Sequence, residues 1–459
     1  MNKTKEKLSP VVLGAYSMGE VGCQLSWYMI NNYLTLFYTD VVGLSASAIS
    51  MIMLIARVWD AVNDPMMGNI ADHTHTRWGK FRPYIFMAPP FLAIFNILTF
   101  TVFPVTGALK VFLCLICYVG TGMAYTACSI AYQALQNVIT LDSQTRMNLA
   151  TARGLGSSII GIILSAVAMP LILKFSGSDV ANARGYFWVT VILSIVMIPI
   201  FWICGIGCKE KYSQPVEATQ SSDKKMGFLD SFKIICKNDQ LLLVVIATVL
   251  GTICVSGRMG ILTYYIIYVN GDYTVISTVF TTMTVAQLIG IFILPLGTKF
   301  MNKRNYMIVL NLVMAASFLL IYLNPHCNQV YLLVVSFIAG LCNSSSSICY
   351  GLVGDSIEYG AWKTGERQEG IAASMLSFGV KCSTAISGSA SVLLLAAFGY
   401  VAGAEQTADA QQGINTVVNL IPFIMAILSN VPLLFYKLTP KKVEEIRADL
   451  DAGKHAYDK

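Results

Sequence analysis

Long apolar runs dominate this chain of 459 residues and recur from near residue 11 to near residue 436. A helix needs about 20 consecutive apolar residues to cross the hydrocarbon core of a bilayer. Every backbone polar group in lipid must also be hydrogen bonded within the protein, so runs of this length predict helices, whereas a barrel would show short alternating segments. We therefore predict an all-α, polytopic membrane protein with twelve transmembrane helices. The twelve spans are expected near residues 11–38, 45–71, 83–105, 108–137, 147–174, 184–207, 241–268, 273–299, 305–323, 329–353, 370–400 and 412–436.

Charge is scarce and unevenly distributed. Hydrophobic residues make up 55% of the chain and charged residues only 12%, about half the charged fraction of a typical soluble protein. The net charge of +6 lies in loops between the spans, which indicates membrane topology rather than a nucleic-acid partner. One set of alternate loops carries most of the Lys and Arg residues, and the other holds only Lys110, Lys174 and Arg184. The positive-inside bias therefore predicts that both termini are cytoplasmic.

One long polar interruption divides the spans into six and six. It predicts an N-terminal half at residues 1–207, a cytoplasmic central loop at 208–240, a C-terminal half at 241–436 and a cytoplasmic tail from 437 to 459. Transporters built from two repeated halves have this arrangement, with the substrate path at the interface of the halves. Within the tail, Pro440 and the spacing of Val443, Ile446 and Leu450 predict a short amphipathic helix.

The second span contains three ionisable residues on one helical face. Arg57, Asp60 and Asp64 are separated by three and four residues. Two carboxylates one turn apart repel each other unless a proton or a cation lies between them. This pattern indicates a site for a monovalent cation. The alternative is an Arg57–Asp60 ion pair that only fastens two helices, with Asp64 in water at the membrane edge.

Four further charged residues interrupt the spans, and such residues are functional candidates because they are costly in lipid. They are Glu20, Arg153, Arg258 and Lys381. When Arg57 and the two aspartates of the second span are counted as well, four cationic groups stand against three acids, so a cavity could hold an anion or pair its charges internally. Structural alternatives remain: Lys381 could pair with an aspartate of the second span, and Glu20 and Arg153 could lie at membrane boundaries, where long side chains reach water easily.

Polar uncharged residues form a stripe along the fourth span. Its members advance by three or four residues and are Thr126, Ser129, Gln133, Gln136 and Asn137. Together with Trp27 and Tyr28 of the first span, they offer the hydrogen bonds and aromatic faces that sugars need. The alternative is hydrogen bonding between helices.

Three separated motifs resemble those of a known family. They are Arg57-Val-Trp-Asp60-Ala-Val-Asn-Asp64-Pro65, Arg77-Trp78-Gly79-Lys80-Phe81-Arg82-Pro83, and a late segment from Gly354-Asp355-Ser356-Ile-Glu358 to Arg367. In this order they resemble the glycoside–pentoside–hexuronide:cation symporters of the major facilitator superfamily, which include the melibiose and glucuronide permeases. The resemblance covers essentially the whole chain.

The resemblance implies a cation-coupled sugar importer that works by alternating access, and no enzyme activity or cofactor. It places the coupling ion, Na+ or H+, at Asp60 and Asp64 with help from Thr126, so that these aspartates would ligate the metal if sodium is the ion. The expected substrate-binding residues are Glu20, Trp27, Tyr28, Ser129, Gln133, Arg153 and Lys381. The expected gating or coupling residues are Arg57, Lys80, Arg82, Asp355, Glu358 and Arg367, the last five in two charged loops.

The chain also departs from the melibiose-type pattern. Val21 and Ser129 align with acidic sugar ligands, and Gln133 aligns with a tryptophan, so the galactoside clamp is absent. Glu20 is a candidate replacement, although a shift of one residue turns a helix by about 100°. Fewer cavity acids would suit a hexuronide facing Arg153 or Lys381, and a neutral pentoside is the alternative.

Two other functions remain open at this point: an exchanger of anionic sugars without cation coupling, and a membrane sugar sensor that does not transport. The sequence leaves the sugar, the ion and the oligomeric state open, and a monomer is one option for the last. The resemblance and the topology place the protein in a bacterial inner membrane.

Overall fold

The computed structural model describes residues 8–74, 76–140, 143–211, 238–364, 369–402, 404–452 and 454. In this part of the chain the regular structure is helical, apart from an isolated bridge between Thr76 and Gly79. The helices in the first half of the sequence are α1 (Pro10–Leu36), π-helix η1 (Phe37–Val41), α2 (Ala46–Asp72), α3 (Arg82–Thr99), α4 (Ala108–Ile139), α5 (Ser143–Ser176) and α6 (Ala183–Gly207). Those in the second half are α8 (Asp239–Tyr268), α9 (Val275–Phe300), α10 (Lys303–Leu323), α11 (Gln329–Asn343), α12 (Ser346–Thr364), α13 (Glu369–Ala397), α14 (Ala408–Asn415), π-helix η2 (Thr416–Leu420), α15 (Ile421–Leu428), α16 (Asn430–Leu434) and α17 (Pro440–Asp451).

Polar side chains fix where several of these helices begin. Ser45 caps α2, Asn182 caps α6, Asn238 caps α8 and Asn328 caps α11, each accepting a backbone N–H of the first turn. Such caps satisfy donors that have no partner within the helix. The helices therefore start at residues that the local sequence specifies.

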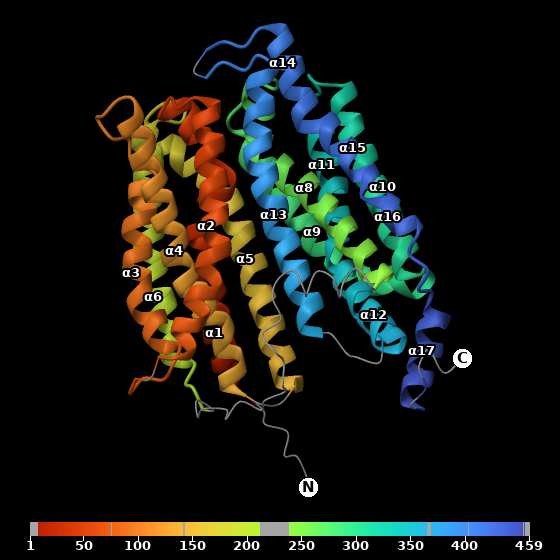
Figure 1. The fold of residues 1–459 in the computed structure, drawn as a ribbon. Coiled ribbons are helices and arrows are strands. Elements are labelled where there is room, and N and C mark those ends of the chain that lie inside the picture. Colours follow the sequence, from red (N-terminus) through yellow and green to blue (C-terminus); the bar gives the residue numbers. More distant parts are fainter. Residues whose placement is uncertain are drawn as a thin grey trace. The chain divides into compact units, whose positions relative to one another are not determined.

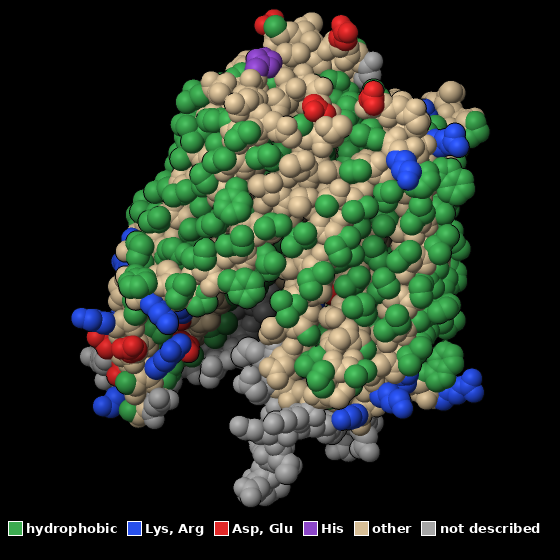
Figure 2. Space-filling model, turned by 180° about the vertical axis from the view of Figure 1, so that it is seen from behind, with side chains coloured by type: hydrophobic (Ala, Val, Ile, Leu, Met, Phe, Trp, Pro, Cys, Tyr) green, Lys and Arg blue, Asp and Glu red, His purple; other side chains and the backbone are tan. Residues whose placement is uncertain are grey.

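The surface of the helices suits lipid. Within the described ranges, ten segments are long and apolar enough to cross a membrane. Large apolar side chains lie exposed along them, including Phe112, Ile195 and Phe292. Figure 2 shows such side chains along the helices and most charged groups near their ends. A water-soluble protein rarely exposes apolar surface on this scale.

Two of the twelve predicted spans are not among these ten segments. They correspond to α1, whose apolar character is diluted by Glu20, Gln24, Asn31 and Asn32, and to α3, whose 18 residues include an arginine, an asparagine and three prolines. At 1.5 Å per residue, α3 covers about 27 Å, slightly less than a typical hydrocarbon core of about 30 Å. Both remain helices at the expected places.

The chain forms two compact units. Unit 1 comprises residues 1–220, 272–281 and 401–405, and unit 2 comprises 221–271, 282–400 and 406–459. In unit 1, α1 packs against α5 and α6, and α3 packs against α4 and α6. In unit 2, α8 packs against α13, α15 and α12 (Figure 1). Each unit has its own buried apolar core.

Two predicted spans are not single α-helices. The tenth is broken: α11 ends at Asn343 and α12 begins at Ser346. The twelfth consists of α14, η2, α15 and α16. The expected loop that carries Asp355 and Glu358 is wrong, because both residues lie within α12, which continues to Thr364.

The predicted amphipathic tail helix is confirmed as α17. Thr439 caps it by accepting the N–H of Lys442, and Pro440 occupies its first turn. Val443 and Ile446 are buried in the core of unit 2. The apolar stripe of the tail therefore docks on the unit from which the tail emerges.

Candidate functional site

The two carboxylates of α2 lie against α4. The hydroxyl of Thr126 donates a hydrogen bond of 3.0 Å to Asp64 Oδ1. Asp60 lies opposite Gly122, where a Cβ atom would come within 2.9 Å of Asp60 Oδ1. Glycine at 122 thus leaves room for the carboxylate. The structure brings together the three residues expected to bind the coupling ion.

Arg57 joins this carboxylate pair to an aromatic pair. Its guanidinium lies 3.6 Å from Asp60 Oδ2 and 5.4 Å from the ring centre of Trp27. Trp27 in turn stacks on Tyr125 with 4.5 Å between ring centres. A distance of 3.6 Å is too long for a strong hydrogen bond, so Arg57 neutralises Asp60 only loosely. One side chain therefore contacts both the candidate ion site and an aromatic surface.

Glu20 and Arg153 form a close ion pair between α1 and α5. Arg153 Nε donates to Glu20 Oε2 at 2.7 Å, and the guanidinium lies over the ring of Tyr132. The Glu20 side chain is 11% exposed and that of Arg153 is 36% exposed. Gln24 extends the contact by donating to Ser157 at 2.9 Å. Glu20 thus already has a cationic partner, and much of the charge of Arg153 is offset within unit 1.

The remaining substrate candidates of unit 1 are spread along α1 and α4. Ser129 is buried and donates to the carbonyl of Thr126 at 3.5 Å, whereas Gln133 is exposed. Tyr28 is half-buried, and its ring lies 6.2 Å from that of Tyr33. Gln136, further along the stripe, accepts from Tyr16 at 3.3 Å. The polar stripe of α4 is therefore used partly for contacts between helices.

Two basic residues of unit 2 differ in their surroundings. Lys381 is half-buried on α13. Arg258 on α8 is only 1% exposed, donates to Asn419 at 3.4 Å and lies 4.6 Å from the ring centre of Phe318. Arg258 is thus enclosed by its own unit, which favours the structural alternative for this residue.

A carboxylate that we did not predict holds the loop between α2 and α3. Glu210, just after α6, accepts the backbone N–H groups of Lys80 and Phe81 at 2.8 Å and of Arg82 at 2.9 Å. The side chain of Arg82 donates to the carbonyl of Gly205 at 2.8 Å. Because these N–H groups begin α3, Glu210 acts as a negatively charged cap from another helix.

We expect Glu210→Gln to lower the stability of the protein by about 1–2 kcal/mol, because an amide NH₂ would replace one of the two accepting oxygens. Thermal unfolding of the purified protein in detergent would measure the loss. Glu405→Gln is the matched control, since Glu405 is exposed and lies in the same unit. Equal melting temperatures for the two variants would show that the cap contributes nothing.

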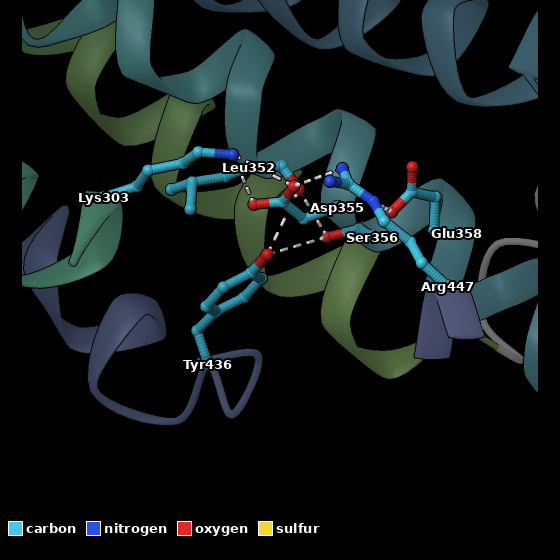
Figure 3. A network of polar contacts seen from close by, with 7 residues as sticks. All are labelled: Lys303, Leu352, Asp355, Ser356, Glu358, Tyr436 and Arg447. Atoms are coloured by element: carbon cyan, nitrogen blue, oxygen red, sulfur yellow. Dashed lines mark hydrogen bonds and ion pairs between the residues drawn. The ribbon is translucent and has the colours of Figure 1, made fainter. Parts of the chain in front are cut away.

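A network of charges fastens α17 to α12 in unit 2 (Figure 3). Lys303 Nζ lies 3.0 and 2.8 Å from the two oxygens of Asp355. Arg447 Nη2 lies 3.8 Å from Asp355, and its Nε donates to Glu358 at 2.7 Å. Tyr436 donates to the carbonyl of Leu352 beside this network. Arg367, the remaining gating candidate, lies outside the described residues.

Both acids of α12 thus have partners in their own unit. The hydrogen bond to Glu358 raises the pKa of the Arg447 guanidinium above its ordinary value, so Arg447 stays charged throughout the physiological range. The sequence did not predict that Lys303 or Arg447 takes part in this network. The only signals for them were a basic loop and a basic position on the predicted tail helix, and neither names the partner acid.

The fold is one that solved membrane transporters also have. One of the most similar solved structures is a crystal structure of a bacterial homologue of the human lysosomal transporter Spinster, with a TM-score of 0.67 and 12% identity. The match covers 95% of this chain and 100% of that chain. At this level of identity the likeness shows the fold, which is the twelve-helix major facilitator fold.

The sequence comparisons identify the family. Residues 15–440 match the family described as MFS/sugar transport protein, and the chain belongs to it. The isoprimeverose transporter of Lactiplantibacillus pentosus is 33% identical over 97% of this chain and 91% of the relative. The glucuronide carrier protein homolog of Escherichia coli (strain K12) is 29% identical over 98% and 97%, and the inner membrane symporter YicJ of the same strain is 28% identical over 96% and 94%.

The predicted family, fold class and absence of an enzyme role are therefore confirmed. The protein is a multi-span membrane protein that transports sugar, and it is related to symporters.

Proposed function

We propose that the protein imports a glycoside, pentoside or hexuronide together with Na+ or H+ by alternating access. The observation that carries this proposal is the pair of carboxylates that α2 presents to α4, Asp64 against the Thr126 hydroxyl and Asp60 against Gly122. Carboxylate and hydroxyl oxygens are suitable ligands for Na+, and a carboxylate pair can equally hold a proton. Arg57 supplies the neutralising charge when the ion is absent.

Coupling follows from the position of Arg57. An ion that binds to Asp60 competes with the Arg57 guanidinium, which would then change its contact with Trp27. The stacked rings of Trp27 and Tyr125 are a suitable surface for the apolar face of a sugar. Linkage requires that if the ion raises the affinity for sugar, the sugar raises the affinity for the ion by the same factor.

The contacts of Arg153 bear on the class of sugar. Its pairing with Glu20 leaves less positive charge for a substrate carboxylate, which favours a neutral glycoside or pentoside. The similarity to an isoprimeverose transporter points the same way, whereas the similarity to a glucuronide carrier supports a hexuronide. Lys381 is the remaining candidate partner for a carboxylate.

The charged loops take a supporting role in this proposal. With both termini in the cytoplasm, the contacts of Lys80, Arg82, Asp355 and Glu358 lie toward the cytoplasmic side and stiffen each unit there. Rigid ends allow each half to move as one body when the side that is open to water changes.

Uptake into vesicles of the purified, reconstituted protein tests the proposal. Labelled isoprimeverose, methyl glucuronide and xylose are supplied in turn under a sodium gradient alone or a proton gradient alone. We expect one of these sugars to accumulate above its external concentration under one of the gradients. Exchange of internal for external sugar that ignores both gradients would instead favour the exchanger, and binding without any loading would favour a sensor.

A further inference from the structure

Unit 2 contains a mostly apolar cavity with several polar side chains in its walls, and it includes none of the site residues described above. It has a volume of about 220 Å³ and lies between α8, α10 and the break that separates α11 from α12. All of its lining residues belong to unit 2. A liquid water molecule occupies about 30 Å³, so the cavity has room for about seven waters.

The break in the helix forms one wall. Ser344 and Ser345 donate their N–H groups to the carbonyls of Leu341 and Cys342, three residues back, so the regular pattern is interrupted. Asn343, Ser345 and Ser346 around this break line the cavity. Interrupted helices in transporters commonly form substrate or ion sites, because irregular backbone is tolerated only where it faces protein or a hydrated space.

The opposite wall is a single face of α8. Thr248, Gly251, Thr252 and Ser256 recur at three- to four-residue spacing and line the cavity. The Thr248 hydroxyl donates to the carbonyl of Val244 at 2.8 Å and also contacts the Cys349 thiol, so it is already partnered within the wall.

Three polar side chains in the cavity have no hydrogen-bond partner within the part of the chain that the structure describes. Among the described residues, none hydrogen bonds to the side chains of Thr252, Ser256 or Asn343. They provide both donors and acceptors, which is the chemistry that a sugar hydroxyl matches. The walls also include Val255 and Met314, which offer apolar surface to the carbon face of a ring. Polar groups in an otherwise apolar cavity are costly unless water or a ligand satisfies them.

We propose that this cavity is a subsite for a single neutral sugar ring, a proposal that rests on the proposed function. No charged side chain lines it, so it offers no counter-charge to a carboxylate or to an ion. Its volume lies below the about 300–1,000 Å³ of sites for larger ligands, which limits the occupant to one ring.

Filling the cavity tests the proposal. A Cβ at Gly251 would meet no atom within 4 Å, so Gly251→Leu extends into the empty space and replaces a poor helix former. Gly260→Leu is the matched control, because Gly260 lies on the same helix, has the same free space at Cβ and does not line the cavity. Thr252→Val removes one hydroxyl and keeps the shape of the side chain.

The probe is methyl β-D-xylopyranoside, and its Kd is measured by titration calorimetry on the full-length protein in detergent. We expect Gly251→Leu to weaken binding about tenfold or more and Thr252→Val several-fold, with Gly260→Leu like the wild type and all melting temperatures similar. Equal affinity in all four proteins would overturn the proposal, as would a wild type that does not bind the probe.

The outcome can be separated from that of the transport experiment. If the wild type accumulates a sugar under a gradient but Gly251→Leu binds the probe normally, the result supports transport and refutes the subsite. If Gly251→Leu loses binding of the probe but the wild type accumulates no sugar, the result supports the subsite and refutes symport.

Discussion

Asp60→Asn is expected to abolish concentrative uptake, so that the internal sugar concentration rises only to the external value. The substitution keeps the size of the side chain but removes the charge that attracts a cation and that Arg57 partly neutralises. Without ion binding the gradient performs no work on the sugar, and a tenfold accumulation needs about 1.4 kcal/mol from that gradient. Uptake into reconstituted vesicles under the effective gradient measures the loss.

Asp272→Asn is the matched control for this experiment. Asp272 is exposed in the loop before α9 and accepts hydrogen bonds only from Thr274 among the described residues. We expect this variant to accumulate sugar normally. An Asp60→Asn protein that still concentrates sugar would refute the assignment of the coupling ion to α2.

Asp355→Asn is expected to destabilise unit 2 by about 2–3 kcal/mol, which is the cost of removing the charge of a buried acid from its two cationic partners. The Asp355 side chain is only 9% exposed and faces both Lys303 and Arg447. Neutralising it leaves two cations without their shared acid. The melting temperature in detergent would fall accordingly.

Glu358→Gln provides the comparison. Among the described residues, Glu358 forms an ion pair only with Arg447, whose side chain is more exposed than that of Lys303. Exposed pairs contribute about 0–1 kcal/mol, so this variant should melt close to the wild type. If the two variants lower the melting temperature equally, the burial of Asp355 does not determine how much the ion pairs contribute to stability.

Local periodicity explains what the sequence predicted well. The face of α2 that carries Arg57, Asp60 and Asp64 follows from helical spacing alone, and so does the docking stripe of α17. Both depend on residues a few positions apart. The Arg57–Asp60 contact, which the sequence analysis gave as the alternative to a cation site, is present in the structure within α2.

Contacts between distant residues were not predictable in the same way. Glu20 and Arg153 were both candidates, but they are 133 residues apart, and nothing in the spacing shows that they pair. Glu210 lies about 130 residues from the N–H groups that it caps. Choosing partners at such separations requires knowing which helices pack together.

The end of a membrane-spanning run is also a poor guide to the end of a helix. Asp355 and Glu358 follow an apolar stretch and therefore suggested a loop, yet α12 continues through them because its backbone hydrogen bonds do not depend on lipid. Conversely, the serines around residue 345 lie within an apolar stretch where the helix breaks. Polarity and helical continuity are separate properties at both places.

Because Arg57 lies over Trp27, ion binding at the carboxylates is expected to change the fluorescence of this tryptophan. An indole in contact with a tyrosine ring and a guanidinium emits in a strong local electric field, and departure of the guanidinium changes that field. Occupancy of the carboxylates would thus appear in the intrinsic fluorescence of Trp27, with no label attached. The chain has six tryptophans. Replacing the other five with phenylalanine would leave Trp27 as the only source of tryptophan fluorescence.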